Sequence, residues 1–188
     1  MKKHNHIPYV LITTLYYPAI LGTLIYSMLN DIASFGSGSL SVDIMIIVAS
    51  LGIVVSFTFD YLYSLSFKEH YSMKYFVFDI VILYLLLISY NSLLKSIKQV
   101  SEFSTFYSCY TLIHIIFTIW DVFVVNKKDR SYSIISYDIL GSIFSVVGYY
   151  GFRSDSYAAI TLLWVTTVYY FMVSKEAIFP IINQHNNG

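Results

Sequence analysis

Four aspartates lie a few residues inside apolar segments, and each directly follows an aromatic residue: Asp60, Asp79, Asp121 and Asp138. The first two flank a charged turn around Lys68, and the other two flank a basic turn at 127–130 with the sequence Lys-Lys-Asp-Arg. Carboxylates that converge inside a membrane repel one another unless a bound cation or shared protons neutralise them. Two interpretations are open: the four form an ion or proton site, or they pair with the basic residues of the turns and hold helices together.

A polar stripe runs along the segment that ends at Asp121. Its members follow helical spacing and fall on one face: Tyr107, Tyr110, Thr111, His114, Thr118 and Asp121. Polar side chains on one face of a membrane helix need partners or water. We therefore predict that Tyr107, Tyr110, His114 and Thr118 line a hydrated path, or a subunit seam beside one, that ends at the aspartates. His114 either relays protons or is a packed histidine that hydrogen-bonds a neighbouring Tyr or Thr.

The elements that must position these residues are membrane spans. The 188-residue chain is 57% hydrophobic and 12% charged, with a mean hydropathy of +0.65. Six apolar runs are long enough to cross a hydrocarbon core of about 30 Å at about 1.5 Å per helical residue: residues 7–29, 42–66, 74–94, 103–125, 132–150 and 157–173. The sequence predicts an all-α, polytopic transmembrane helical bundle of about six spans, one transmembrane domain over residues 1–188 with no soluble domain.

Basic residues are distributed unevenly between the two faces of such a bundle. With the N-terminus in the cytoplasm, eight of the eleven Lys and Arg residues fall in cytoplasmic segments, and Lys95, Lys98 and Arg153 fall in outer ones. Cytoplasmic loops of membrane proteins carry an excess of Lys and Arg. We therefore expect a multi-pass protein of the cytoplasmic (inner) membrane with both termini in the cytoplasm.

Motifs typical of metal sites, hydrolases and nucleotide-binding proteins are missing from the sequence. Cys109 is the only cysteine, so neither a disulfide nor a paired-cysteine metal site can form within the chain. No zinc-protease, serine-hydrolase or phosphate-loop motif is present. We expect no catalytic residues, no enzyme activity, no cofactor and no metal centre. A formal net charge of zero also disfavours direct nucleic-acid binding.

Two functional hypotheses follow from these patterns. The first is a cation- or proton-linked channel or transporter with an acidic layer near the cytoplasmic face. We expect it to be a homo-oligomer, because six short spans hardly enclose a wide path alone. The alternative is a membrane subunit or effector of a bacterial stress or antiviral defence system that acts with a soluble cytoplasmic partner. In both cases the lipid bilayer is the immediate partner.

The predicted membrane topology, with both termini in the cytoplasm, can be tested by cysteine labelling. In a Cys109→Ser background, a cysteine at Ser37 should react with a membrane-impermeant reagent added outside intact cells, and a cysteine at Lys128 should not. The physical reason is the bias of basic residues toward the face that carries Lys128. The reverse labelling pattern would place both termini outside.

Overall fold

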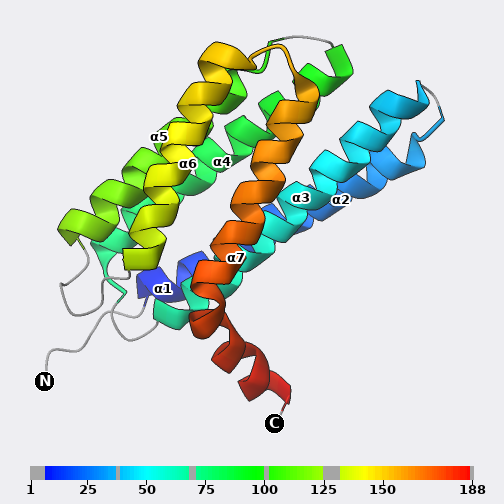
Figure 1. The fold of residues 1–188 in the computed structure, drawn as a ribbon. Helices are drawn as coiled ribbons and strands as arrows, with labels where there is room; N and C mark the ends of the chain where they lie inside the picture. The colour runs from blue at the N-terminus through cyan, green and yellow to red at the C-terminus, as the bar shows by residue number, and fades with distance from the viewer. Residues whose placement is uncertain (1–6, 37–38, 68–70, 100–101, 125–131, 187–188) are drawn as a thin grey trace, which may run out of the picture.

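The protein is an all-helical bundle over the residues that the computed structural model describes, which are 7–36, 39–67, 71–99, 102–124 and 132–186 (Figure 1). Its elements in chain order are α1 (Ile7–Leu11), η1 (Ile12–Tyr16), α2 (Tyr17–Ala33), α3 (Leu40–Ser64), η2 (Leu65–Phe67), α4 (Met73–Gln99), α5 (Ser104–Ile119), η3 (Trp120–Val124), α6 (Tyr132–Gly151) and α7 (Ser156–Asn186). Six helical stretches are long and apolar enough to cross a membrane. The predicted fold class of a six-span helical bundle is confirmed.

Three helices run clearly past the predicted ends of their spans. The first span was predicted to end at 29, but α2 continues to Ala33. The third span was predicted to end at 94, but α4 continues to Gln99, and the last was predicted to end at 173, but α7 continues to Asn186. Hydropathy marks where the apolar stretch ends, whereas the helix ends only where backbone hydrogen bonding stops. Polar residues such as Lys98 and Lys175 continue these helices beyond their apolar parts.

Pro18 changes the helix type in the first span. The segment η1, just before it, is a π-helix, and the backbone N–H of Tyr17 bonds to the carbonyl of Ile12, five residues back. Proline has no N–H, so the carbonyl one turn before it loses its usual partner. A single π turn is one way to absorb that loss inside a span. The local disturbance near Pro18 takes the form of a π turn between α1 and α2.

Five helices surround the centre of the bundle. Helix α3 packs on α7, α7 on α6, α6 on α5, α5 on α4 and α4 on α3, and α2 packs against the outside of α3. Figure 1 shows that α1 begins and α7 ends at the same end of the bundle. Large side chains with almost no exposure fill the centre, including Phe57, Phe106 and Leu163. The helices of one chain therefore bury a continuous core at the centre of the bundle.

Helices α5 and α6 approach closely because two glycines of α6 face aromatic rings of α5. A Cβ atom added at Gly141 would lie 2.5 Å from Cε1 and Nε2 of His114, and one added at Gly148 would collide with the ring of Tyr107. Small residues at helix contacts allow this kind of approach in membrane proteins. The His114 ring thus packs directly against the α6 backbone at Gly141, which limits its position.

This contact predicts a stability difference between glycine variants. Gly141→Ala and Gly148→Ala should each lower the free energy of unfolding by about 1–3 kcal/mol, the usual cost of overpacking a tight core. The control is Gly22→Ala in α2, where nothing lies within 4 Å of the added Cβ, and alanine there should be neutral or slightly stabilising. Thermal unfolding in detergent measures all three, and a Gly141→Ala protein as stable as the parent would contradict the contact.

Candidate functional site

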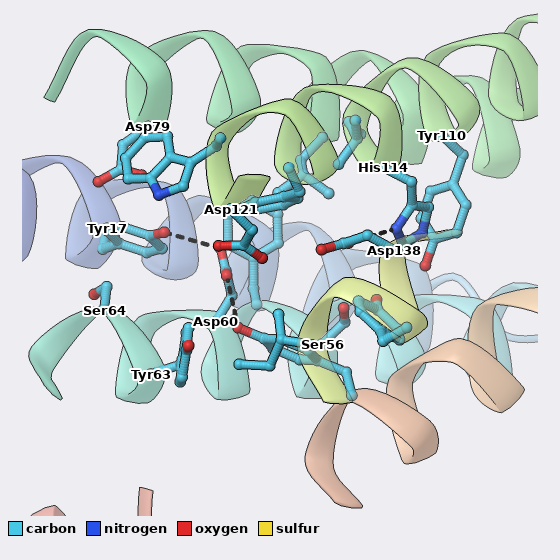
Figure 2. Close-up of a pocket in the computed structure, with 18 of the residues that line it drawn as sticks. Tyr17, Ser56, Asp60, Tyr63, Ser64, Asp79, Tyr110, His114, Asp121 and Asp138 are labelled. Atoms are coloured by element: carbon cyan, nitrogen blue, oxygen red, sulfur yellow. Dashed lines mark hydrogen bonds and ion pairs between the residues drawn. The ribbon is translucent and has the colours of Figure 1, made fainter. Parts of the chain in front are cut away.

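All four predicted aspartates line one cavity inside the bundle. Asp60 comes from α3, Asp79 from α4, Asp121 from η3 and Asp138 from α6. Each of the four contributes to the wall of this cavity, so each faces the interior of the protein. Figure 2 shows the labelled carboxylates among the helices, with Asp60, Asp121 and Asp138 in the middle of the view and Asp79 to one side.

Helical spacing explains why these side chains meet. Ser56, Tyr63 and Ser64 share a face of α3 with Asp60, and all three line the same cavity. Asp60 and Asp121 lie near the ends of their spans, whereas Asp79 and Asp138 lie near the starts of theirs. Because consecutive spans run in opposite directions, these positions fall at one end of the bundle. The cavity therefore lies toward the end where α1 begins and α7 ends.

Two tyrosine hydroxyls donate to Asp60. Tyr17 of α2 donates to Oδ2 at 2.9 Å, and Tyr170 of α7 donates to Oδ1 at 3.3 Å. Figure 2 shows the bond from Tyr17 to Asp60 as a dashed line. One carboxyl of α3 therefore connects three helices, and each of its oxygens has a neutral donor.

Asp79 has a tyrosine partner from the segment before its own helix. The hydroxyl of Tyr71 donates to Oδ2 of Asp79 in a short hydrogen bond. Tyr71 lies just before α4, outside the membrane spans. Burial, followed by the nearby Asp79 carboxyl, raises the pKa of Tyr71 well above its usual range. Tyr71 therefore stays a neutral phenol that donates its proton to the carboxyl.

His114 and Asp138 form a buried pair. Nδ1 of His114 lies 3.0 Å from Oδ1 of Asp138, and their side chains are only 2% and 1% exposed. The imidazole also contacts the rings of Tyr110 and Tyr137 edge to face, at centroid distances of 4.9 and 5.1 Å. The sequence prediction of a Tyr or Thr as the hydrogen-bond partner of the His114 ring was wrong, because the carboxylate of α6 occupies that position. Tyr110 instead bonds Thr166 at 2.7 Å.

Two carboxylate oxygens in this region have no hydrogen-bond partner among the described residues. They are Oδ2 of Asp121 and Oδ2 of Asp138. The carboxyl groups of Asp121 and Asp138 lie close enough to repel each other when both are charged. The carboxyl group of Asp60 is close enough to repel those of Asp138 and Asp79 in the same way. Asp121 is carried by η3, a π-helical turn that follows α5. Such turns are frequent at functional sites.

The structural interpretation requires basic partners for these acids, and the described residues supply no Lys or Arg in contact with them. No Lys or Arg in the described part of the chain lines the cavity. Within that part, the ion pair that involves a Lys or Arg joins Lys98 to Asp31, outside the cavity. The imidazole of His114 hydrogen-bonds Asp138. Of the basic residues near the four acids in the sequence, Lys74 is described and forms no ion pair with another described residue. The others lie outside the described residues: Lys68, Lys127, Lys128 and Arg130.

The predicted path along α5 is only partly present. Tyr110 and His114 line the acidic cavity, but Tyr107 lines a second cavity between α6 and α7, and Thr118 lines neither of the two. The Thr118 hydroxyl donates to the backbone carbonyl of His114 instead. Tyr107 and Thr118 therefore do not reach the acidic cavity, and their place on a path or at a subunit seam stays a prediction. Helical spacing places side chains on one face, but a threonine can satisfy its hydroxyl within its own helix.

Several cavity residues were missed from the sequence. Tyr17, Tyr75 and Trp120 line the acidic cavity without standing out from the many aromatic residues of the chain. Tyr170 had a signal, because it shares a face with Thr166, Thr167 and Ser174 in the last span. Aromatic rings near the ends of spans are expected at any membrane interface, so composition alone does not separate the ones that face a cavity.

The cavity is small and is not built as a metal site. Its volume is about 80 Å³, enough for about five water molecules. Among the described residues, no group of three or more His, Cys, Asp or Glu side chains is placed to hold a metal ion. The arrangement can hold protons, water or one small cation.

Comparison with known protein families, characterised proteins and solved structures finds no match for this chain. Its function must therefore be argued from the cavity itself.

The hydrogen bonds of Asp60 lead to a stability prediction. Tyr17→Phe and Tyr170→Phe should each lower the free energy of unfolding by about 0.6–2 kcal/mol, the range for hydrogen bonds between membrane helices. Tyr84→Phe is the matched control, since that ring is 65% exposed on the outside of α4 and its loss of a hydroxyl should change little. Unfolding by a denaturing detergent measures the difference. Equal stability of all four proteins would show that these bonds do not hold α2, α3 and α7 together.

Proposed function

We propose that this protein moves protons or small cations across a membrane, as a channel or transporter. The cavity is the site where the transported cation binds transiently on its way. The observation that carries the proposal is a set of four aspartates in one cavity with no described Lys or Arg in its wall. Negative charge inside a bilayer is costly. Protons or cations that enter the cavity would neutralise it, and a site that is neutralised reversibly can pass its cation on.

The arrangement of donors supports this role. Tyr17, Tyr71 and Tyr170 each donate to a carboxylate without bringing a positive charge. His114 is the one described ionisable base at the cavity, and its Nδ1 atom is hydrogen-bonded to Asp138. Neutral donors hold a carboxyl in place while leaving its charge available to a mobile cation. A fixed lysine would remove that charge permanently.

The described residues of one chain supply walls for the cavity. Five packed helices and Tyr17 of α2 supply its walls. The expectation of a homo-oligomer came from doubt that six short spans could enclose a path, and the cavity supports transport by a single protomer. Assembly into oligomers is not required for the cation-binding step that we propose.

Asp121→Asn is the sharpest test of transport. Asparagine keeps the volume and removes the charge, and Oδ2 of Asp121 has no hydrogen-bond partner in the described part of the chain that would be lost. A carboxylate about 4 Å from a cation contributes about 4 kcal/mol at an effective dielectric constant near 20. We therefore expect the flux to fall at least about tenfold, which corresponds to about 1.4 kcal/mol. The measurement is luminal pH and cation content in liposomes under an imposed potential.

The matched control is Asp43→Asn, the same chemical change in the first turn of α3 and outside the cavity. Its flux should equal that of the parent. The proposal fails if the parent protein carries no more flux than protein-free liposomes, or if the Asp121→Asn protein assembles normally and carries the parental flux.

A further inference from the structure

We infer that the acidic cavity selects small organic ammonium cations over metal ions. This inference names a substrate class for the proposed function and rests on it. It comes from the wall of the cavity, the free acceptors in it and its size, three features that together fit an alkylammonium ion.

The wall of the cavity is aromatic on every side. Six different elements contribute a ring to it: Tyr17 of α2, Tyr63 of α3, Tyr75 of α4, Trp120 of η3, Tyr137 of α6 and Tyr170 of α7. The rings of Tyr75 and Trp120 stack at a centroid distance of 4.7 Å, and those of Tyr63 and Tyr170 meet edge to face at 5.9 Å. Aromatic rings attract organic cations, and cages of such rings recognise alkylated ammonium groups.

The acceptors for such a cation are buried oxygens without partners. The Asp138 side chain is 1% exposed, and its Oδ1 faces His114, while its Oδ2 has no partner in the described part of the chain. Asp121 supplies a second such oxygen. An ammonium group provides N–H donors and a positive charge, which are the two things these oxygens lack.

A metal ion fits this site poorly. Calcium takes six to eight oxygen ligands at about 2.3–2.6 Å, and magnesium requires an octahedron of oxygens. The described carboxylates lie on different walls and form no group of three that could hold a metal. Two of them, Asp60 and Asp79, already accept hydrogen bonds from tyrosines. An ammonium ion needs one or two carboxylates and can satisfy its remaining surface against rings.

The volume limits the size of the cation. A space of about 80 Å³ holds about five waters, which is comparable with an ammonium group carrying a few carbons. We therefore choose ethylammonium as the probe. Potassium at the same ionic strength is the matched inorganic ion, because screening of surface charges is then identical.

Binding can be followed in the purified full-length protein through Trp120, which lines the cavity. Trp164 packs against Gly52 between α3 and α7, outside the cavity, and serves as an internal reference. Ethylammonium chloride should change the fluorescence saturably, and potassium chloride should not. The Trp120→Phe protein should lose the saturable signal.

Three variants separate the contribution of the aromatic ring from that of the carboxylate charge. Tyr63→Phe keeps the ring and should bind ethylammonium like the parent, whereas Tyr63→Leu should weaken binding about threefold to tenfold, in line with the loss of one cation–π contact. Asp121→Asn should weaken binding at least about tenfold, because it removes a charge. Calorimetric titration of the same proteins checks the affinities without relying on fluorescence.

The inference is overturned if potassium binds as tightly as ethylammonium, if ethylammonium does not bind, or if Tyr63→Leu binds like the folded parent. In any of these cases, flux in liposomes that still depends on Asp121 would leave the proposed function standing and remove only the substrate class. If neither ethylammonium binding nor such flux is found, both proposals fall.

Discussion

Negative charge in a medium of low dielectric constant is the constraint on which this structure depends. A carboxylate in the membrane needs hydrogen-bond donors and a neutralising charge. Here the donors come from other parts of the chain, so each interaction that solvates an acid also fixes the packing. Asp60 ties α3 to α2 and α7, and Asp138 ties α6 to α5. The neutralising charge is the part that the described chain does not supply, and this difference is the basis of the proposed function.

Close packing between α5 and α6 makes the His114 and Asp138 pair possible. Gly141 and Gly148 leave room for the rings of His114 and Tyr107, and a side chain at either position would push the helices apart. The π turn η3 then changes the helix geometry at Asp121, where α5 ends. Irregular backbone inside a membrane is tolerated where protein surrounds it or where it lines a cavity. Asp121 meets that condition.

Most of the fold could be predicted from the sequence, because membrane spans are set by a single strong requirement, a long apolar helix. The convergence of the four aspartates was also predictable, since their similar distances from the span ends place them at one level. The partners of these acids were not, because Tyr17 and Tyr170 are distant in sequence and look like ordinary interfacial tyrosines. The hydroxyl of Thr118 bonds within its own helix, a contact that helical spacing does not reveal. The ends of α4 and α7 were misplaced because hydropathy does not determine where a helix stops.

The central claim is that the acids of the cavity are neutralised by a mobile cation or proton and not by the basic turn of the same chain. A double-mutant cycle tests it most directly, combining Asp121→Asn with the joint replacement of Lys127, Lys128 and Arg130 by Gln, read as free energies of unfolding. We predict that the two changes add to within about 0.5 kcal/mol, as independent sites do. A coupling of about 3 kcal/mol or more, the size expected for a broken buried ion pair, would contradict the account.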